Sequence, residues 1–533
     1  MNTQVLICRN IPFDNSYSDV RMFTSESEQN SYFQGKAIKI LNDYSYQRVN
    51  YGIQGSPRLA NTIRVDCKAD EIMTANYIAF QNKDYNGKWF YCFVKSINYV
   101  NDNCSVIEYE IDYYQTWLFQ LSVQPSFVLR EHTNNDVRFA NTQPEPITTK
   151  GSFCVTVQDI HFSPPYYIIV CTSTENDVEK VEKDWGELIE NAGTVSGQII
   201  QNVYQGLKFT QFRTAEEANA FIQSYSERNI LDRIVMVFMS PFDINNNVDN
   251  ELTLNPCPTG TSGYTPRNKK CLQFPYQYLK VSNNKDMVKE WAYEGFCAYG
   301  VDPYTGAIEV QEQPPRVRYS QLVGPPPQVV VNPIMYWGLS ATTDKGEFDQ
   351  GVTLSGFPTC SWVGNAFAGW LDSTLTNSAL TLLATGIASV IGTPAAGASV
   401  LGANIGGVVK NAYEFGQVAI APEKVGGLPS GNYSGMSMGW TGFSFKAMSL
   451  LPEQMMRLDS FFDSYGYATN LWKAPNLTGR ASWNYVQLRD AHIIGSMPVE
   501  AITRIKQAFE DGIRIWHVDD VGNLSRDNHI IGG

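Results

Sequence analysis

The sequence predicts a mainly β protein with an α+β insertion and a long hydrophobic loop rich in Gly and Ala. Three observations support this fold class. Aromatic residues make up 13% of the 533 residues, and aromatic side chains favour sheets. Hairpin turns and amphipathic helix patterns occupy different parts of the chain. Finally, residues 373–409 contain no Asp, Glu, Lys, Arg or His.

Residues 1–149 are expected to form a β-rich domain. Asn86-Gly87 is a strong hairpin signal, because both turn positions require positive φ. This turn joins an apolar strand at 76–81 to a second at 88–100. A further Asn-rich turn leads into a third strand at 104–114, so we expect an antiparallel meander.

Residues 150–345 are expected to form the α+β insertion. Thr214 and Glu217 have the spacing of a capping box and predict a helix start. A second amphipathic helix is predicted over 177–193, and short apolar strands lie between the helices. Proline clusters within 311–328 are incompatible with a central strand or a helix interior, so we place a boundary after them.

The rest of the chain divides into a low-charge loop at 346–430 and a C-terminal region at 431–533. Two helices are predicted in that region, over Pro452–Gly466 and Pro498–Gly512. Proline is favoured in the first turn of a helix and glycine just past its end, which sets these bounds.

Composition and charge exclude several classes of function. The formal net charge is −13, which argues against a nucleic-acid clamp but allows nucleic acid to pass along an acidic wall. The ten cysteines form no CxxC pair and the five histidines are scattered, so we expect reduced thiols, no metal site and no cofactor. The N-terminus lacks a long apolar segment, and no signal peptide is expected.

Two stretches have the outline of a catalytic motif without its context. GTPAAGAS at 392–399 has alanine where a phosphate-binding loop needs lysine. GMSMG at 435–439 would make Ser437 a nucleophile, but a strand-like segment follows it where a helix is required. The remaining residues of that hydrolase order would be Asp459 or Asp490, and then His517. Neither stretch is therefore expected to supply a catalytic residue.

Glu108, Glu110 and Asp112 alternate, so all three are expected on one face of a strand. Three interpretations stay open at this point. They could be paired carboxylates for glycoside hydrolysis, a solvated strand face, or an acidic stripe that lines a channel.

The uncharged run contains two candidate helices, at 375–391 and 395–413, separated by Gly-Thr-Pro. Each would span roughly 25–28 Å at 1.5 Å per residue, which is barely enough for a bilayer. The run could be a permanent membrane anchor or a buried core hairpin. It could also be a hairpin that is hidden against copies of itself and enters a bilayer when released.

Long aromatic-rich blocks near both ends carry a resemblance to a known family. They lie at 20–33, 77–99, 110–120, 127–132, 461–495 and 508–523, and include NGKWFYCFV and FFDSYGYATNLWKAPN. In sequence and order they resemble the tail-knob, or distal tail-tube, proteins of small short-tailed bacteriophages that infect Gram-positive bacteria.

The resemblance implies a homohexameric ring with a tail-tube-like β-barrel wall, at the tail tip of the virion and made in the host cytoplasm. Other phage tail proteins, those of the proximal tube and collar, would be partners. Double-stranded DNA would pass through without being specifically bound. Glu108, Glu110 and Asp112 would then be candidates for an acidic face of the lumen. The resemblance implies no enzymatic activity and no catalytic residue.

The same resemblance implies that the hydrophobic loop plugs the channel and engages the host cell membrane on ejection. The loop residues that we expect to be membrane-active are Leu375, Leu380, Leu382, Leu383, Ile387, Val390, Ile391, Pro394, Val400, Leu401, Gly402, Ile405, Gly406, Val408 and Val409. The alternatives are a tail-associated receptor-binding protein and a cell-wall polysaccharide-degrading enzyme with paired carboxylates.

Overall fold

The computed structural model divides the chain into two compact units. Unit 1 comprises Met1–Lys150, Tyr264–Cys271 and Pro452–Gly533, and unit 2 comprises Gly151–Gly263 and Leu272–Leu451. The structure describes residues 3–44, 49–50, 61–82, 86–149, 151–162, 167–173, 193–200, 203–228, 234–243, 249–302, 308–322, 328–338, 350–355, 357, 359–361, 428–430 and 441–531.

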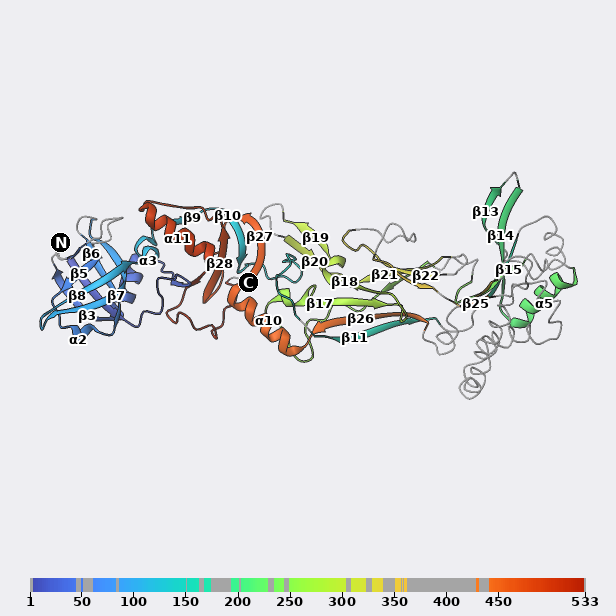
Figure 1. The fold of residues 1–533 in the computed structure, drawn as a ribbon, viewed down its shortest axis with the longest axis horizontal. Coiled ribbons are helices and arrows are strands. Elements are labelled where there is room, and N and C mark those ends of the chain that lie inside the picture. Colours follow the sequence, from blue (N-terminus) through green and yellow to red (C-terminus); the bar gives the residue numbers. More distant parts are fainter. Residues whose placement is uncertain are drawn as a thin grey trace, which may run out of the picture. The chain divides into compact units, whose positions relative to one another are not determined.

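Unit 1 contains a seven-stranded antiparallel sheet in the order β3-β1-β6-β7-β8-β5-β4 (Figure 1). The strands are β1 (Thr3–Arg9), β3 (Ala37–Tyr44), β4 (Val49–Asn50), β5 (Thr62–Val65), β6 (Ala75–Asn82), β7 (Lys88–Asn101) and β8 (Cys104–Ile111). The predicted meander is confirmed as β6-β7-β8. Asn86 and Gly87 have φ of 56° and 76°, which is the backbone that the hairpin requires.

Both faces of this sheet are buried, because alternate residues of its strands enter two different cores. Ile78 and Phe80 of β6 belong to a cluster made by the described strands and by α2 (Ala69–Ile72). That composition indicates that the sheet curls over the cluster. Tyr77 and Ala79, on the opposite face, pack with residues from the C-terminal part of the chain.

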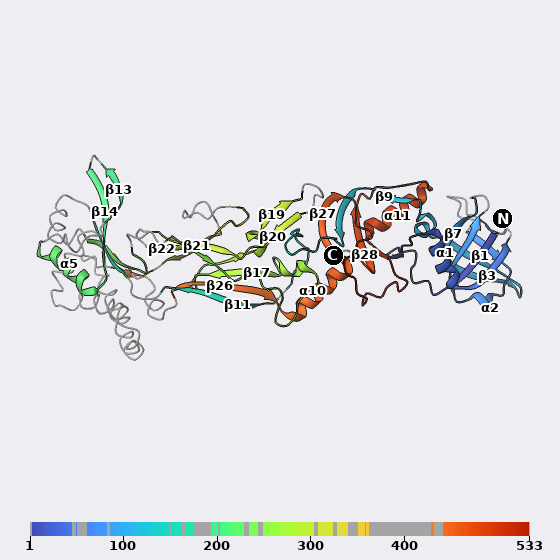
Figure 2. The same ribbon diagram turned by 180° about the vertical axis from the view of Figure 1, so that it is seen from behind.

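Short helices pack against the sheet, and one of them follows directly after β8. The helix α1 (Glu26–Gly35) begins at Ser25, whose side chain accepts a hydrogen bond from the Glu28 amide, and Figure 2 shows it beside β1. Phe33 of α1 stacks on Tyr77 with ring centroids 5.1 Å apart. The strand β8 leads directly into α3 (Tyr113–Trp117).

A five-stranded sheet in unit 1 joins the two ends of the chain. Its order is β2 (Asp19–Arg21), β30 (Ile513–Trp516), β28 (Trp483–Arg489), β10 (Ser126–Glu131) and β27 (Tyr467–Lys473). The pairing of β2 with β30 is parallel. A separate pair joins β9 (Leu121–Val123) to β29 (Ile493–Gly495).

The two helices predicted near the C-terminus are confirmed as α10 (Pro452–Tyr465) and α11 (Val499–Asp511). Gly466 and Gly512 follow them with φ of 64° and 99°, a conformation that glycine adopts readily. In α11 the proline stands one residue before the first helical position, at the N-cap.

The described residues of unit 2 form three larger sheets and a two-stranded ribbon. The first sheet is β11 (Ser152–His161), β26 (Gly442–Leu450), β17 (Gln277–Ser282) and β18 (Val288–Trp291). The second is β13 (Gly193–Ile200), β14 (Val203–Phe212), β12 (Tyr167–Ser173), β15 (Ile234–Ser240), β24 (Thr359–Ser361) and β25 (Leu428–Ser430). The third is β16 (Asp249–Thr253), β21 (Arg316–Leu322), β22 (Gln328–Pro333) and β23 (Val352–Ser355). The ribbon joins β19 (Ala298–Val301) to β20 (Ile308–Gln311).

The helical elements of unit 2 include α5 (Ala215–Glu227) and the 3₁₀ turn η5 (Tyr293–Phe296). The capping box of α5 is confirmed. The Glu217 amide donates to Thr214 Oγ1 at 3.3 Å, and the Thr214 amide donates to Glu217 Oε2 at 3.4 Å. The helix predicted over 177–193 lies outside the described residues, apart from Gly193 in β13.

Two sequence-based boundaries differ from the structure. The proline clusters within 311–328 flank β21, a central strand between β16 and β22, so they bound a strand inside unit 2. The strand β26 lies in the predicted C-terminal region but pairs with β11 and β17 of unit 2. The chain therefore passes from unit 2 to unit 1 between Leu451 and Pro452.

Candidate functional site

Two of the three predicted acidic residues lie on β8 and are half-buried. Glu110 lies 3.2 Å from Lys95 Nζ and 3.9 Å from Arg504, and Asn15 Nδ2 donates to it at 3.3 Å. Glu108 accepts a hydrogen bond from the Ser96 hydroxyl at 3.2 Å. Glu110 is therefore partly neutralised by two cations, an arrangement that does not favour a paired-carboxylate catalytic site.

Asp112 does not belong with these residues, and its placement on the same strand face is wrong. The strand β8 ends at Ile111, and Asp112 is the N-cap of α3. Its carboxylate accepts hydrogen bonds from the Tyr77 hydroxyl at 2.8 Å and the Gln115 amide at 3.0 Å, and it is buried. Burial raises the pKa of Asp112 to about 7.

The residues assigned to the membrane-active loop, from Leu375 to Val409, lie outside the described residues, as does Ser437. Within the part of the chain that the structure describes, no helix has the length and hydropathy to span a membrane. The role of the loop stays a prediction.

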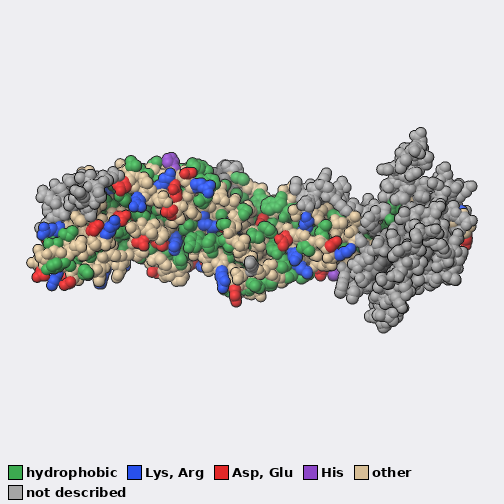
Figure 3. Space-filling view, viewed as in Figure 1, with side chains coloured by type: hydrophobic (Ala, Val, Ile, Leu, Met, Phe, Trp, Pro, Cys, Tyr) green, Lys and Arg blue, Asp and Glu red, His purple; other side chains and the backbone are tan. Residues whose placement is uncertain are grey.

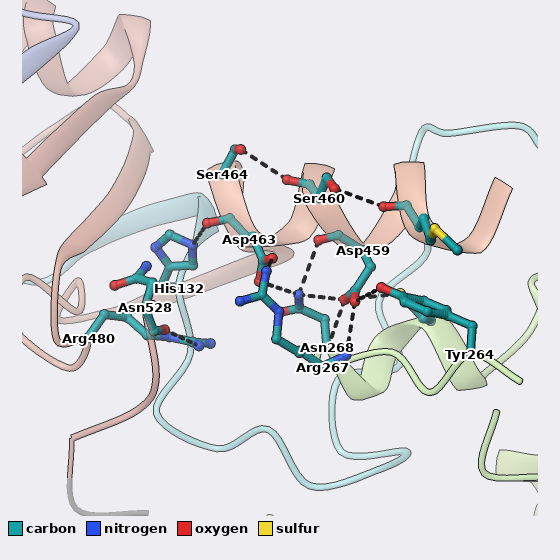
Figure 4. A network of polar contacts seen from close by, with 12 residues as sticks. His132, Tyr264, Arg267, Asn268, Asp459, Ser460, Asp463, Ser464, Arg480 and Asn528 are labelled. Atoms are coloured by element: carbon teal, nitrogen blue, oxygen red, sulfur yellow. Dashed lines mark hydrogen bonds and ion pairs between the residues drawn. The ribbon is translucent and has the colours of Figure 1, made fainter. Parts of the chain in front are cut away.

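The most elaborate polar site of unit 1 is a buried network centred on Asp459 of α10 (Figure 4). We call it the α10 junction. One carboxylate oxygen accepts from the Tyr264 hydroxyl at 2.6 Å and the Arg267 amide at 3.0 Å. The other accepts from the Asn268 amide at 2.9 Å and from Asn268 Nδ2 at 2.8 Å. Four donors from one short segment, Tyr264–Cys271, thus converge on one carboxylate.

One helical turn later, Asp463 extends the α10 junction. Its carboxylate is paired with Arg267 and accepts from Asn268 Nδ2 at 2.8 Å. Its carbonyl oxygen lies 3.0 Å from Nε2 of His132. Because Nδ1 of His132 accepts from the Tyr485 amide at 2.8 Å, Nε2 carries the proton and donates to Asp463. Burial lowers the pKa of His132 to about 3, so the imidazole is neutral.

A second carboxylate, Glu145, holds the other end of the inserted segment. It lies 2.6 Å from Lys270 Nζ and is also paired with Arg130, and all three side chains are almost fully buried. The Ala468 amide donates to Glu145 at 2.8 Å, and Arg130 donates to the Gly466 carbonyl at 2.7 Å. Tyr264–Cys271 is therefore fixed in unit 1 by one carboxylate near each end.

The α10 junction has the chemistry of a structural anchor. The carboxylates of Asp459 and Glu145 accept their hydrogen bonds from donors of the same chain. Among the described residues, no group of three His, Cys, Asp or Glu is arranged to hold a metal ion. The structure shows no approach of Asp459 to His517, whose Nε2 lies 3.1 Å from Asn484 Oδ1.

Sequence reasoning missed the α10 junction. Its hydrogen-bonded partners lie about 190 residues apart, and nothing in a single sequence pairs Asp459 with Asn268. The available signal was the polar run Arg267 to Lys270 directly before a buried cysteine.

Comparisons with known proteins identify the family to which the chain belongs. Residues 243–529, more than half of the chain, match the family model of the C-terminal domain of the tail knob protein gp9 of Bacillus phage phi29. The chain belongs to this family of phage tail knob proteins. The α10 junction lies within the matched range, except for Arg130, His132 and Glu145. Residues 1–122 match a second model, the N-terminus of the caudoviral major tail protein.

Relatives and a solved structure cover almost the whole chain. The tail knob protein gp9 of Bacillus phage B103 is 25% identical over 99% of this chain and 98% of its own length. That of Bacillus phage phi29 is 24% identical with the same coverage. The structure of the bacteriophage C1 tail knob protein, gp12, has a TM-score of 0.55 at 14% identity, and 99% of this chain and 100% of that chain are covered.

These findings confirm the family resemblance drawn from the sequence. The protein is a structural tail knob protein, a component of the virion that acts in a phage tail with other tail proteins. The similarity to this solved structure covers 99% of the chain, and the described residues are mainly β.

Proposed function

We propose that the chain forms the distal end of the phage tail tube as a homohexameric ring, through which double-stranded DNA leaves the virion. The observation that carries this proposal is the match to tail knob proteins over 99% of the chain and 98% of a relative. The match of residues 1–122 to the N-terminus of a major tail protein supports a tube wall in the same region. That region contains the curled seven-stranded sheet.

Charge supports a conduit that does not bind its cargo. Each chain carries −13, so a ring of six carries 6 × −13 = −78. Carboxylates facing the lumen repel phosphate within about 8–10 Å, the Debye length at physiological salt. We place Glu108 and Glu110 on the lumen side of the wall, and leave out Asp112 because it is buried.

Charge reversal tests this placement. Phages with Glu108→Lys and Glu110→Lys should assemble and release DNA more slowly than wild type, since the lumen would then attract phosphate. Glu453→Lys on α10 is the control, because it makes the same charge reversal at an exposed residue that does not lie on β8. Unchanged ejection kinetics in the double variant would remove these residues from the lumen.

We propose further that the low-charge loop at 346–430 plugs the channel and, once released, inserts into the host membrane. The uncharged run at 373–409 supports this role, because six copies can bury one another at a ring axis and still tolerate lipid. The purified protein should permeabilise lipid vesicles, and replacing 373–409 with a Gly/Ser linker of equal length should abolish leakage while the ring persists. Equal leakage from both proteins would refute the membrane role.

A further inference from the structure

Residues 527–531 of unit 1, which we call the C-terminal strap, lie against the residues just before β28 as an extended peptide. The Ala481 amide donates to the His529 carbonyl at 3.0 Å. The Ile531 amide donates to the Gly479 carbonyl, also at 3.0 Å. Hydrogen bonds of this kind are those of a peptide added to a strand, and they act between backbones. Most of the strap is exposed, as the mixed polar and apolar surface in Figure 3 is elsewhere on unit 1.

Asn528 is the buried side chain of the strap, at 7% exposed. Its Oδ1 accepts hydrogen bonds from the Ser482 and Trp483 amides, each at 3.0 Å. Its Nδ2 donates to the Trp483 carbonyl at 2.9 Å. An asparagine side chain carries an acceptor and donors together, so it replaces a strand backbone at this place. Alanine would satisfy none of these three backbone groups.

The strap also holds a buried charge. Arg480 is 7% exposed, and its Nη1 donates to the Asn528 carbonyl at 3.2 Å. Its Nη2 donates to the Thr133 carbonyl at 3.4 Å, and these two are the acceptors of its guanidinium within the described part of the chain. A buried guanidinium is costly unless acceptors compensate for the lost water. The strap therefore supplies one of the two acceptors that keep Arg480 inside.

The charge of Arg480 acts on two carboxylates that hold the segment Tyr264–Cys271. Asp136 accepts a hydrogen bond from the Lys269 amide at 3.3 Å, and Asp463 binds the same segment in the α10 junction. Burial raises the pKa of both carboxyl groups, while hydrogen bonds and the charge of Arg480 oppose that rise. Arg480 thus favours the ionised form in which both groups accept hydrogen bonds.

A second route from the strap to α10 runs through the backbone after β10. Thr133, which accepts from Arg480, directly follows His132 in the chain. Nε2 of His132 donates to the Asp463 carbonyl at 3.0 Å. Figure 4 shows Asn528, Arg480 and His132 on one side of Asp463, with the inserted segment on the other. The contacts are continuous from the strap to the α10 junction.

We infer that the C-terminal strap is a clasp that controls the α10 junction. While Asn528 is seated, Arg480 stays inside and Tyr264–Cys271 is held in unit 1. When the strap leaves, Arg480 loses an acceptor and gains hydration by turning outward, so the two carboxylates lose its charge and the segment loosens. The strap connects an exposed peptide to a buried network, so whatever takes hold of the peptide releases the network.

Hydrogen exchange of the full chain tests the inference. Asn528→Ala should accelerate exchange of peptides covering Tyr264–Cys271 at least about fivefold, the lower end of typical couplings between linked sites, and leave β7 unchanged. His529→Ala is the matched control, because its side chain is exposed and its carbonyl stays in place. It should exchange like the wild type. Faster exchange at Ala481 without any change over Tyr264–Cys271 would overturn the inference.

Native-state exchange of the wild type in rising urea does not depend on the folding of a variant. Peptides covering 479–483 report on the strap, those covering 264–271 on the α10 junction, and those covering 88–101 on the seven-stranded sheet. The first two should lose protection together, at lower urea than the third. If 264–271 loses protection while 479–483 keeps it, or if all three open only together, the strap does not control the junction.

Discussion

The substitution Asp459→Ala would remove the centre of the α10 junction. Four hydrogen bonds from Tyr264, Arg267 and Asn268 end on this carboxylate, and all four donors would lose their acceptor. A hydrogen bond contributes about 1 kcal/mol net, so the expected loss is about 4 kcal/mol. Hydrogen bonds to a charged acceptor contribute more, about 1.5–3 kcal/mol each, so about 4 kcal/mol is the lower end of the expected loss.

The assay is urea unfolding of the full chain, combined with hydrogen exchange of peptides that cover Tyr264–Cys271. Asp459→Ala should lower the unfolding midpoint of unit 1 and increase exchange at the Arg267 and Asn268 amides. Asp511→Ala is the control, since Asp511 is exposed at the end of α11 and surface changes usually stay within about 0.5 kcal/mol. A loss below about 1 kcal/mol with unchanged exchange would refute the reasoning.

Two further predictions concern unit 1. The pKa of Asp112 is about 7 in the folded protein and about 3.8 ordinarily. Protonated Asp112 therefore favours the folded state: its contribution to the free energy of unfolding is full below pH 3.8 and is lost as the pH rises through 7. The loss amounts to up to about 4 kcal/mol. Asp112→Asn keeps the cap, so urea midpoints at pH 5 and pH 8 should converge in that variant; an unchanged difference would exclude Asp112 as its source. Gly466→Ala would place a Cβ on the Glu131 carbonyl at positive φ and should cost more than about 2 kcal/mol, whereas Gly35→Ala has no atom within 4 Å and should be nearly neutral by thermal unfolding. Equal melting temperatures for the two glycine variants would contradict that geometry.

Local rules located the elements whose bounds depend on one or two residues. Asn86-Gly87 placed the meander because only positive φ closes that turn. Gly466 and Gly512 marked the ends of α10 and α11, because glycine readily adopts the positive φ found there. These effects act within a few residues, and a single sequence contains them in full.

The alternation of Glu108, Glu110 and Asp112 failed at its last residue, because an N-cap ended the strand before the pattern did. Asp is equally suited to an exposed strand position and to a helix cap, so composition does not separate the two. The domain boundary predicted at the proline clusters around β21 was wrong for a similar reason. Prolines mark the ends of a strand but do not indicate which strands pair on either side of it.

The α10 junction was beyond sequence reasoning because its partners come together only in the folded unit. Arg267 to Lys270 is a polar run like many surface loops until α10 and Glu145 surround it.

Negative-stain electron microscopy of the purified full chain tests the central claim most directly. Six-fold rings with a central hole wide enough for duplex DNA are the predicted result. Single compact particles, or rings of another order without a hole, would contradict the account of this tail knob protein as the distal tube.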